Sequence, residues 1–374
     1  MSQAKTSGPE KRGTPKRVLI LTTYPFGAVA SQRFSHEQYI DVLRKAGIET
    51  NIEAFLSEAT WEVLYKPGYY FQKAYGVLWG FIKRFMLLPG ILRYDFVYLA
   101  REAAPLGPPI IEAILFLLRR KVIYFLDDAI FIPRTTKVNR LAALLKWASK
   151  VPYTALRSHK VVAANRFMAD WASQYNRHVV LIPSTIDPSY HRPLARPLTA
   201  SRQPIIGWTG SHSTSGYLDI IRPVLKRLQE DHDFEFRVIC DVDPAFPELK
   251  RYRFVKWRLE SEIEDLGSFH IGVMPVPEGD WEKGKVGFKA VQYAAMGIPA
   301  VVSATGSGHE VVKDRQTGFV VNNTEEGWGS ALVALLNDAE MRHRFGSAAR
   351  EHILKQYSVP AQTQAYIELF KCAE

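Results

Sequence analysis

The sequence predicts an α/β protein built from two doubly wound domains, each with a parallel sheet between layers of helices. Short β-branched or aromatic segments alternate with helix-length segments from Arg17 onward, the alternation stops at a proline-rich stretch, and it then resumes. The length of 374 residues fits two domains at roughly 150 residues each. We expect the two sheets to face each other across a cleft at the carboxyl ends of their strands, where such sheets bind ligands.

Composition divides the chain into five parts. Residues 1–16 form a basic leader of the kind that stays disordered, and residues 17–190 form the first domain. Residues 191–203 form a linker rich in proline, and residues 204–357 form the second domain. The last part, residues 358–374, reads as a helix that begins with a serine and a proline.

Each predicted strand is a short apolar run bounded by turn residues. In the first domain these runs cover residues 17–23, 48–55, 95–100, 121–126, 160–165 and 179–183. In the second domain they cover residues 205–210, 234–241, 252–257, 269–276, 299–303 and 317–321. Amphipathic segments stand between consecutive runs, and a helix between two strands is the connection that makes neighbouring strands parallel.

A formal net charge of +10 and a pI near 9.4 favour an acidic partner, which can be nucleic acid, anionic lipid or a phosphorylated small molecule. No nucleic-acid-reading motif is recognisable, so we expect no nucleic acid partner. Cys240 and Cys372 are the two cysteines, and their wide separation predicts neither a disulfide nor a zinc site. We therefore expect a reducing, cytoplasmic location.

Residues 69–96 are the most membrane-like segment of the chain. Lys73, Lys83 and Arg84 interrupt the segment before about 20 apolar residues accumulate, which argues against a membrane span. Aromatic residues mixed with basic ones are typical of a helix that lies on an anionic bilayer, here the inner face of the membrane. An ordinary core helix with charged edges is the alternative.

The segment KVGFKAVQYAAMGIPAVVS, residues 285–303, predicts an anion site. Lys285 and Lys289 bracket the pair Gly287 and Phe288 where a helix begins, and a helix N-terminus offers free N–H groups and a partial positive charge. The alternative interpretation is two solvated lysines on a loop.

Small or polar residues also follow several other predicted strands. Gly207, Thr209 and Gly210 either let the backbone approach a phosphate or form a plain turn. Asp127 and Asp128 follow the strand at 121–126, and because neighbouring residues of an extended chain point to opposite sides, we expect only one of them, Asp128, to face the cleft.

The chain resembles the family 4 (group 1) glycosyltransferases of GT-B fold. In the second domain the resemblance rests on GKVGFKAVQYAAMGIPAVVS, HIGVMPVPEGDW and GHEVVKDRQTGFVV, and in the first on LTTYPFGAVASQRF and YFLDDAIF. It implies a metal-independent, retaining enzyme without a separate cofactor. Such an enzyme moves a sugar from a nucleoside diphosphate donor, of UDP or GDP type, to a glycan, lipid-linked or small-molecule acceptor. It also implies that the helix at 358–374 packs back on the first domain.

The resemblance implies roles for individual residues. Lys285, Lys289 and Asp128 are the expected catalytic residues. The two lysines are expected to supply positive charge because this chain lacks the arginine and lysine that the family places after the first strand of its second domain. The residues expected to bind the donor are Gly207, Thr209, Gly210, Trp257, Gly287, Phe288, Gln292, Gly308, Glu310, Gly27 and Arg33.

Two glutamates that the family separates by seven residues are absent. Their positions hold Gly284 and Gln292, and an amide can still bind ribose hydroxyls because it both donates and accepts hydrogen bonds. Two alternatives stay open: a nucleotide-sugar epimerase or hydrolase of the same fold, and a noncatalytic scaffold, which the missing acids favour. The triplet at 241–243, Asp-Val-Asp, is similar to the metal motif of GT-A enzymes, but it follows a strand within the second domain, and we predict no metal site.

Overall fold

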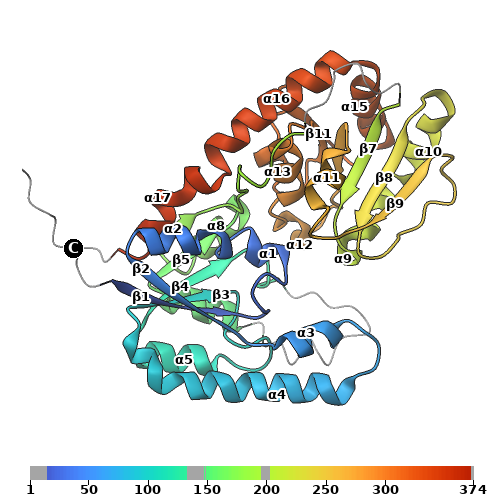
Figure 1. Ribbon diagram of the computed structural model, residues 1–374. Helices are drawn as coiled ribbons and strands as arrows, with labels where there is room; N and C mark the ends of the chain where they lie inside the picture. The colour runs from blue at the N-terminus through green and yellow to red at the C-terminus, as the bar shows by residue number, and fades with distance from the viewer. Residues whose placement is uncertain (1–14, 133–146, 148, 195–202, 372–374) are drawn as a thin grey trace, which may run out of the picture.

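The computed structural model describes residues 15–132, 147, 149–194 and 203–371, so most of the predicted leader, part of the predicted linker and Cys372 lie outside the described residues. Figure 1 shows two α/β domains, and each contains a parallel sheet of six strands. All twelve predicted strands are present, with ends that differ from prediction by at most two residues. The predicted fold class is confirmed.

The N-terminal sheet has the strand order β2-β1-β3-β4-β5-β6. Its strands are β1 (Lys16–Thr22), β2 (Ile48–Ala54), β3 (Phe96–Ala100), β4 (Lys121–Leu126), β5 (Lys160–Ala163) and β6 (Val179–Leu181). The helices of this domain are α1 (Ala30–Arg33), α2 (Ile40–Lys45), α3 (Glu58–Leu64), α4 (Tyr70–Leu87), α5 (Ile110–Leu117), α7 (Lys150–Arg157) and α8 (Arg166–Ser173), with short 3-10 turns at Glu37–Tyr39 and Leu88–Arg93.

The C-terminal sheet has the order β12-β11-β10-β7-β8-β9. Its strands are β7 (Ile205–Thr209), β8 (Glu235–Cys240), β9 (Tyr252–Lys256), β10 (Ile271–Met274), β11 (Ala300–Ser303) and β12 (Gly318–Val321). The helices are α9 (His212–Ser215), α10 (Arg222–Asp231), α11 (Glu262–Gly267), α12 (Asp280–Lys283), α13 (Phe288–Ala295), α14 (Gly308–Val311), α15 (Glu325–Asn337) and α16 (Ala339–Gln356), with a 3-10 turn at Gly216–Ile220.

The cores lie on the two faces of each sheet. All five residues of β3 are buried, as expected for a central parallel strand covered by helices on both sides. In the C-terminal sheet Gly207 of β7 pairs with Gly272 of β10. The ring of Phe269 occupies the space that a side chain at Gly207 would need, and the ring of Tyr293 does the same at Gly272. These glycines therefore let aromatic rings pack directly on the sheet.

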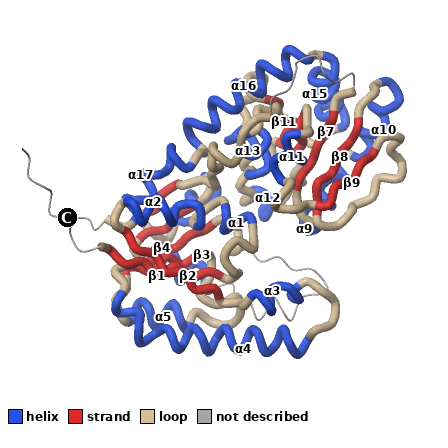
Figure 2. The backbone as a smooth tube through the Cα atoms, in the orientation of Figure 1, coloured by secondary structure: helices blue, strands red, loops and turns tan. Residues whose placement is uncertain are grey.

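The last helix, α17 (Val359–Leu369), connects the two domains (Figures 1 and 2). Ser358 caps its N-terminus by accepting a hydrogen bond from the Ala361 amide at 3.3 Å. The helix follows α16 of the C-terminal domain and then packs on the N-terminal domain, where the ring of Tyr366 stacks on Tyr39 at 3.7 Å between centroids. Lys16 Nζ also donates to the carbonyl of Phe370 at 2.9 Å.

Candidate functional site

Loops at the carboxyl ends of the two sheets meet and bring predicted site residues from both domains together. Lys285 Nζ lies 3.4 Å from Asp128 Oδ1, and Arg33 Nη2 lies 2.9 Å from Glu262 Oε2. The rings of Phe34 and Phe288 pack at 4.4 Å between centroids. We call these six residues and the loops that carry them the interdomain face.

The N-terminus of α13, where the sequence predicts an anion site, lies on this face. Its N-cap residue, Gly287, has a φ of +69°, and no side chain caps the helix or places an acid in its first turn. A Cβ at Gly287 would lie 2.9 Å from the carbonyl oxygen of Ser307, which only glycine avoids. Ser307 in turn donates its amide to the Lys285 carbonyl at 2.8 Å. The segment that holds Ser307 and Gly308 therefore packs against the start of α13, whose first amides have no partner within the helix.

Two ammonium groups add positive charge to this helix terminus. Lys289 Nζ lies 5.3 Å from the centroid of the Trp208 ring, and burial together with the charge of Lys285 lowers its pKa to about 8. Among the described residues Lys289 has no carboxylate partner within ion-pair distance, whereas Lys285 has Asp128. Two cations with one carboxylate leave a net positive site, which suits a diphosphate.

The structure gives a reason for the glycine at position 284. Gly284 is buried, and a Cβ built on it would clash with the Cβ of Ala129, which belongs to the N-terminal domain. The position at which the family carries its first glutamate is thus filled by the other domain. Gln292, at the second glutamate position, is 7% exposed and follows Lys289 by three residues on α13, so the two share one side of the helix.

Arg33 belongs to a second cluster that sequence reasoning missed. Its guanidinium binds Glu262, and Tyr190 Oη and Trp257 Nε1 also donate to that carboxylate, at 2.9 and 3.3 Å. Arg33 is predicted to bind the donor. A donor phosphate would have to compete with Glu262 for it. Because 229 residues separate the partners, no local sequence pattern points to the pair.

Gly27 and Glu310 flank the interdomain face. The amide of Gly27 donates to both carboxylate oxygens of Glu37, at 3.1 and 3.0 Å, so this amide is already occupied in the loop after β1. Glu310 lies in α14, partly exposed, and its main-chain oxygen accepts a hydrogen bond from Tyr357 Oη at 3.2 Å. Gly308, two residues earlier, is buried, and a Cβ there would come within 2.8 Å of Met274 Cε.

The structure gives Gly207 and Thr209, which lie in β7, roles that differ from our prediction. Gly207 lies within the strand beneath Phe269, so its missing side chain serves packing and does not make room for a phosphate. Thr209 donates its amide to Tyr293 Oη at 3.1 Å. Gly210 alone of the three borders the anion site, since a Cβ there would lie 2.9 Å from Lys289 Cε.

The carboxylates of the triplet at 241–243 already have protein partners. Asp241 accepts from the amide of His212 at 2.7 Å and contacts its ring Nδ1 at 2.5 Å, while Asp243 accepts from Tyr252 Oη at 2.5 Å. Within the described part of the chain, no group of three or more His, Cys, Asp or Glu side chains is placed to hold a metal ion.

Asp127 and Asp128 point to different partners, as the alternation of an extended chain predicts. Asp127 binds Arg101 through two bonds, Nε to Oδ1 at 2.5 Å and Nη2 to Oδ2 at 2.9 Å. This pair borders a small hollow at the carboxyl ends of β1, β3 and β4, lined by Thr23, Tyr24, Ser31, Gln32, His36, Ala100, Arg101, Phe125 and Asp127. Burial beside Arg101 lowers the pKa of His36 to about 3, so its ring is neutral.

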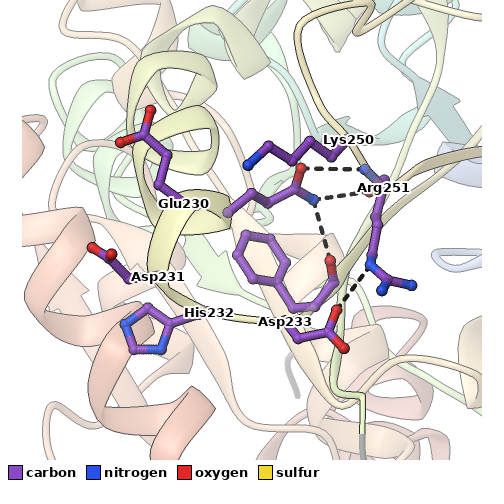
Figure 3. A pocket seen from close by; sticks show the side chains of 8 residues that line it. Glu230, Asp231, His232, Asp233, Lys250 and Arg251 are labelled. Atoms are coloured by element: carbon purple, nitrogen blue, oxygen red, sulfur yellow. Dashed lines mark hydrogen bonds and ion pairs between the residues drawn. The ribbon is translucent and has the colours of Figure 1, made fainter.

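A different hollow lies at the opposite edge of the C-terminal sheet, where α10 ends and β8 and β9 begin (Figure 3). Several of the residues that line it bind one another: Gln229 Nε2 donates to the carbonyls of Phe234 and Arg251 at 3.2 and 3.0 Å. Arg251 pairs with Asp233 at 2.8 Å. These bonds hold α10 on the sheet, so we assign this hollow a packing role.

Comparison of sequences finds similarity in the C-terminal domain. Residues 203–338 match the family described as Glycosyl transferases group 1. The D-inositol 3-phosphate glycosyltransferase of Corynebacterium glutamicum (strain R) is 28% identical over 149 residues. The matched region covers 36% of this chain and 35% of that relative, so it spans about a third of each.

Comparison of structures covers almost the whole chain. A glycosyltransferase from Rickettsia africae superposes with a TM-score of 0.69 over 95% of this chain and 97% of its own, at 14% identity. Sucrose-phosphate synthase from Thermosynechococcus elongatus gives 0.67 over 95% and 99%, and Anabaena HepE gives 0.65 over 94% and 98%, both at 14% identity. The predicted resemblance is confirmed: the chain has the two-domain GT-B fold, and residues 203–338 match the group 1 glycosyltransferases.

Proposed function

We propose that this protein transfers a sugar from a nucleoside diphosphate donor to an acceptor hydroxyl, with retention of configuration. The single observation that carries the proposal is the uncapped N-terminus of α13 between Lys285 and Lys289 on the interdomain face. An anion that binds there is held by fixed amides and two ammonium groups.

The chemistry follows from where charge develops. When the glycosidic bond breaks, the leaving diphosphate gains negative charge, and donors fixed in advance stabilise that state more than the bound donor. One such donor contributes about 2.7 to 4 kcal/mol to the transition state. Lys289 and the α13 amides are the groups that supply this effect, while Gln292, on the same side of α13, binds the ribose hydroxyls.

The acceptor binds on the N-terminal side. Asp128 already reaches the anion site, and the hollow beside Arg101 and Asp127 offers polar groups next to it. Contact between the domains excludes water and orients both substrates, and the oxygen of the departing phosphate takes the proton of the acceptor hydroxyl. In this reaction one glycosidic bond forms as the other breaks, and no metal takes part.

UDP is the first nucleotide to test, with GDP second. The structures of Anabaena HepE include one in complex with UDP-glucose, and a structure of Staphylococcus aureus TarM holds UDP and alpha-GlcNAc-glycerol. Both have the fold of this chain. The C. glutamicum relative is named for a phosphorylated acceptor, and we propose a phosphorylated, lipid-linked or glycan acceptor here.

The first test is a thermal-shift screen with UDP, GDP, ADP and dTDP sugars. The protein is then incubated with the labelled donor that binds, with and without acceptors, and the reaction is repeated in the presence of EDTA. Transfer is expected only when an acceptor is present, to be unaffected by EDTA, and to give a product whose anomeric signal in NMR keeps the configuration of the donor. Release or isomerisation of the sugar without acceptor would identify a hydrolase or epimerase. No thermal shift with any nucleotide would support the noncatalytic scaffold.

A further inference from the structure

Helix α4 packs on the protein through two glycines, the partly buried Val77 and Phe81, and an arginine. Gly76 and Gly80 are buried, and the side chains of Thr60 and Phe55 occupy the space that their Cβ atoms would need. One turn further on, Arg84 is 1% exposed. An ordinary surface helix exposes its charged side, whereas α4 buries an arginine and exposes most of its large apolar side chains.

Arg84 fixes this orientation. Its guanidinium donates to three main-chain carbonyls, those of Ala103 at 2.8 Å, Glu53 at 3.0 Å and Thr22 at 2.7 Å. Rotation or removal of α4 would leave three acceptors and a buried charge without partners, which is costly. The segment Tyr70–Arg93 is long and apolar enough to cross a membrane by length and composition, but these contacts hold it against the domain.

The outward side of α4 is apolar along its whole length. Its exposed large apolar side chains are Tyr70, Phe71, Tyr75, Leu78, Trp79, Ile82, Phe85 and Met86, and Gln72 is an exposed polar residue among them. Steps of three and four residues place most of them in one stripe, about 27 Å long for an 18-residue helix. Figure 1 shows α4 along the outer side of the N-terminal domain, away from the C-terminal domain. Monomeric soluble proteins rarely expose an apolar patch of this extent without a partner.

The charge around the stripe identifies the partner. No aspartate or glutamate occurs in residues 63–94, whereas Lys66, Lys73 and Arg93 lie at or near the ends of α4, and Lys66 and Arg93 are exposed. A second copy of the chain seated on this side would bring cations against cations. Anionic lipid headgroups are complementary, and tyrosine and tryptophan among aliphatic residues suit the boundary between headgroups and acyl chains.

We propose that α4 binds the surface of an anionic lipid bilayer and lies in the plane of that surface, with its exposed apolar stripe among the headgroups. Tyr65, just before α4, contacts the ring of His212 in the C-terminal domain at 6.0 Å between centroids. Bilayer contact would therefore hold this contact between the two domains close to the lipid. This inference goes beyond glycosyl transfer and does not rest on it.

The experiment measures binding of the full-length protein to vesicles, without donor or acceptor. Vesicles of phosphatidylcholine with about 30% phosphatidylglycerol are compared with pure phosphatidylcholine. The variant Phe71→Ser/Leu78→Ser/Met86→Ser alters three residues that are 87%, 59% and 69% exposed, so its melting temperature should match the parent. The control Leu156→Ser/Leu181→Ser alters two residues that are 57% and 45% exposed elsewhere on the N-terminal domain.

The parent and the control are expected to bind anionic vesicles, more weakly at high salt, and the triple variant at least about tenfold more weakly. A fluorophore on Leu78→Cys should be quenched by brominated lipid, and one on Leu156→Cys should not. Equal binding by the triple variant would overturn the proposal. The proposal would also be overturned if the parent protein formed a dimer that does not bind vesicles and the triple variant were a monomer. Because no nucleotide is added, these outcomes are independent of whether the protein transfers sugar.

Discussion

Asp128 of the N-terminal domain lies 3.4 Å from Lys285 of the C-terminal domain, so a carboxylate and an ammonium group meet where the donor diphosphate is proposed to bind. Their side chains are 20% and 25% exposed, which makes the pair partly shielded from solvent. An incoming diphosphate must compete with Asp128 for Lys285. Several predictions depend on this competition and on the neighbouring helix terminus.

Removing the carboxylate of Asp128 should strengthen nucleotide binding and weaken catalysis. In Asp128→Asn, Lys285 is free to bind the diphosphate and the repulsion from Asp128 is lost, so the Kd for UDP should fall about three- to tenfold. Turnover should fall by about a hundredfold or more if Asp128 orients the acceptor. Calorimetry and initial rates measure the two effects. Asp41→Asn, which removes an exposed carboxylate paired with Arg44, is the control and should change neither value.

Lys289→Met should stabilise the fold while it weakens donor binding. Burial lowers the pKa of Lys289 from 10.5 to about 8, so the unfolded state binds more protons and the charged lysine costs stability below pH 8. At 1.36 kcal/mol per pKa unit, discounted for partial exposure, methionine should add about 1 to 2 kcal/mol at pH 7. UDP affinity should drop at least about tenfold. The control is Lys283→Met, which removes an exposed lysine paired with Asp280. Its stability and its UDP affinity should both stay at the parent level.

The same pKa predicts how nucleotide binding depends on pH. Lys289 is protonated below about pH 8 and loses its charge as the pH rises through that value. The terminal phosphate of UDP is already ionised above pH 7, so Lys289 is the group that titrates. The Kd for UDP should rise about tenfold between pH 7 and pH 9, and in Lys289→Met this rise should vanish. An identical pH profile in parent and variant would contradict a direct role of Lys289.

Gly287→Ala should damage the anion site beyond the strain of its backbone. The φ of +69° alone costs about 1 kcal/mol for alanine, and the new Cβ would press on the Ser307 carbonyl at 2.9 Å. Gly47 has a φ of +77° with no heavy atom within 4 Å, so Gly47→Ala measures the strain by itself. Melting temperatures should fall in both variants, but only Gly287→Ala should also lose nucleotide affinity.

Restoring the family's first glutamate should not restore a better enzyme. In Gly284→Glu the new side chain would collide with Ala129 and separate the two domains. We expect turnover to fall at least about tenfold and the radius of gyration in small-angle scattering to increase. The double variant Gly284→Glu/Ala129→Gly should recover part of the loss. A gain in turnover by the single variant would mean that the domains separate easily and that the contact at Ala129 is not needed.

The strands and the predicted anion site could be read from the sequence, but the role of Gly207 could not. The strands were predictable because apolar runs of four to eight residues between turn residues are a local signal, and the β11 run Ala300–Ser303 after a Gly-Ile-Pro turn is a clear case. The anion site was also a local pattern, since its glycine, its two lysines and its helix N-terminus lie within five consecutive residues, 285–289. The role of Gly207 was misjudged because the ring that covers it, Phe269, is far away in the sequence.

The sequence by itself determined the two α/β domains, the glycine and two lysines at the start of α13 and the apolar, basic character of residues 69–96, because each is set by side chains close together along the chain. Only the tertiary structure decided that Arg33 binds Glu262, that Ala129 fills the space beside Gly284 and that α4 turns its apolar side outward. The physical reason is that these facts depend on which surfaces meet after folding. An ion pair, a steric clash and the exposure of a helix face are properties of contacts between distant segments, and no periodicity within one segment encodes them.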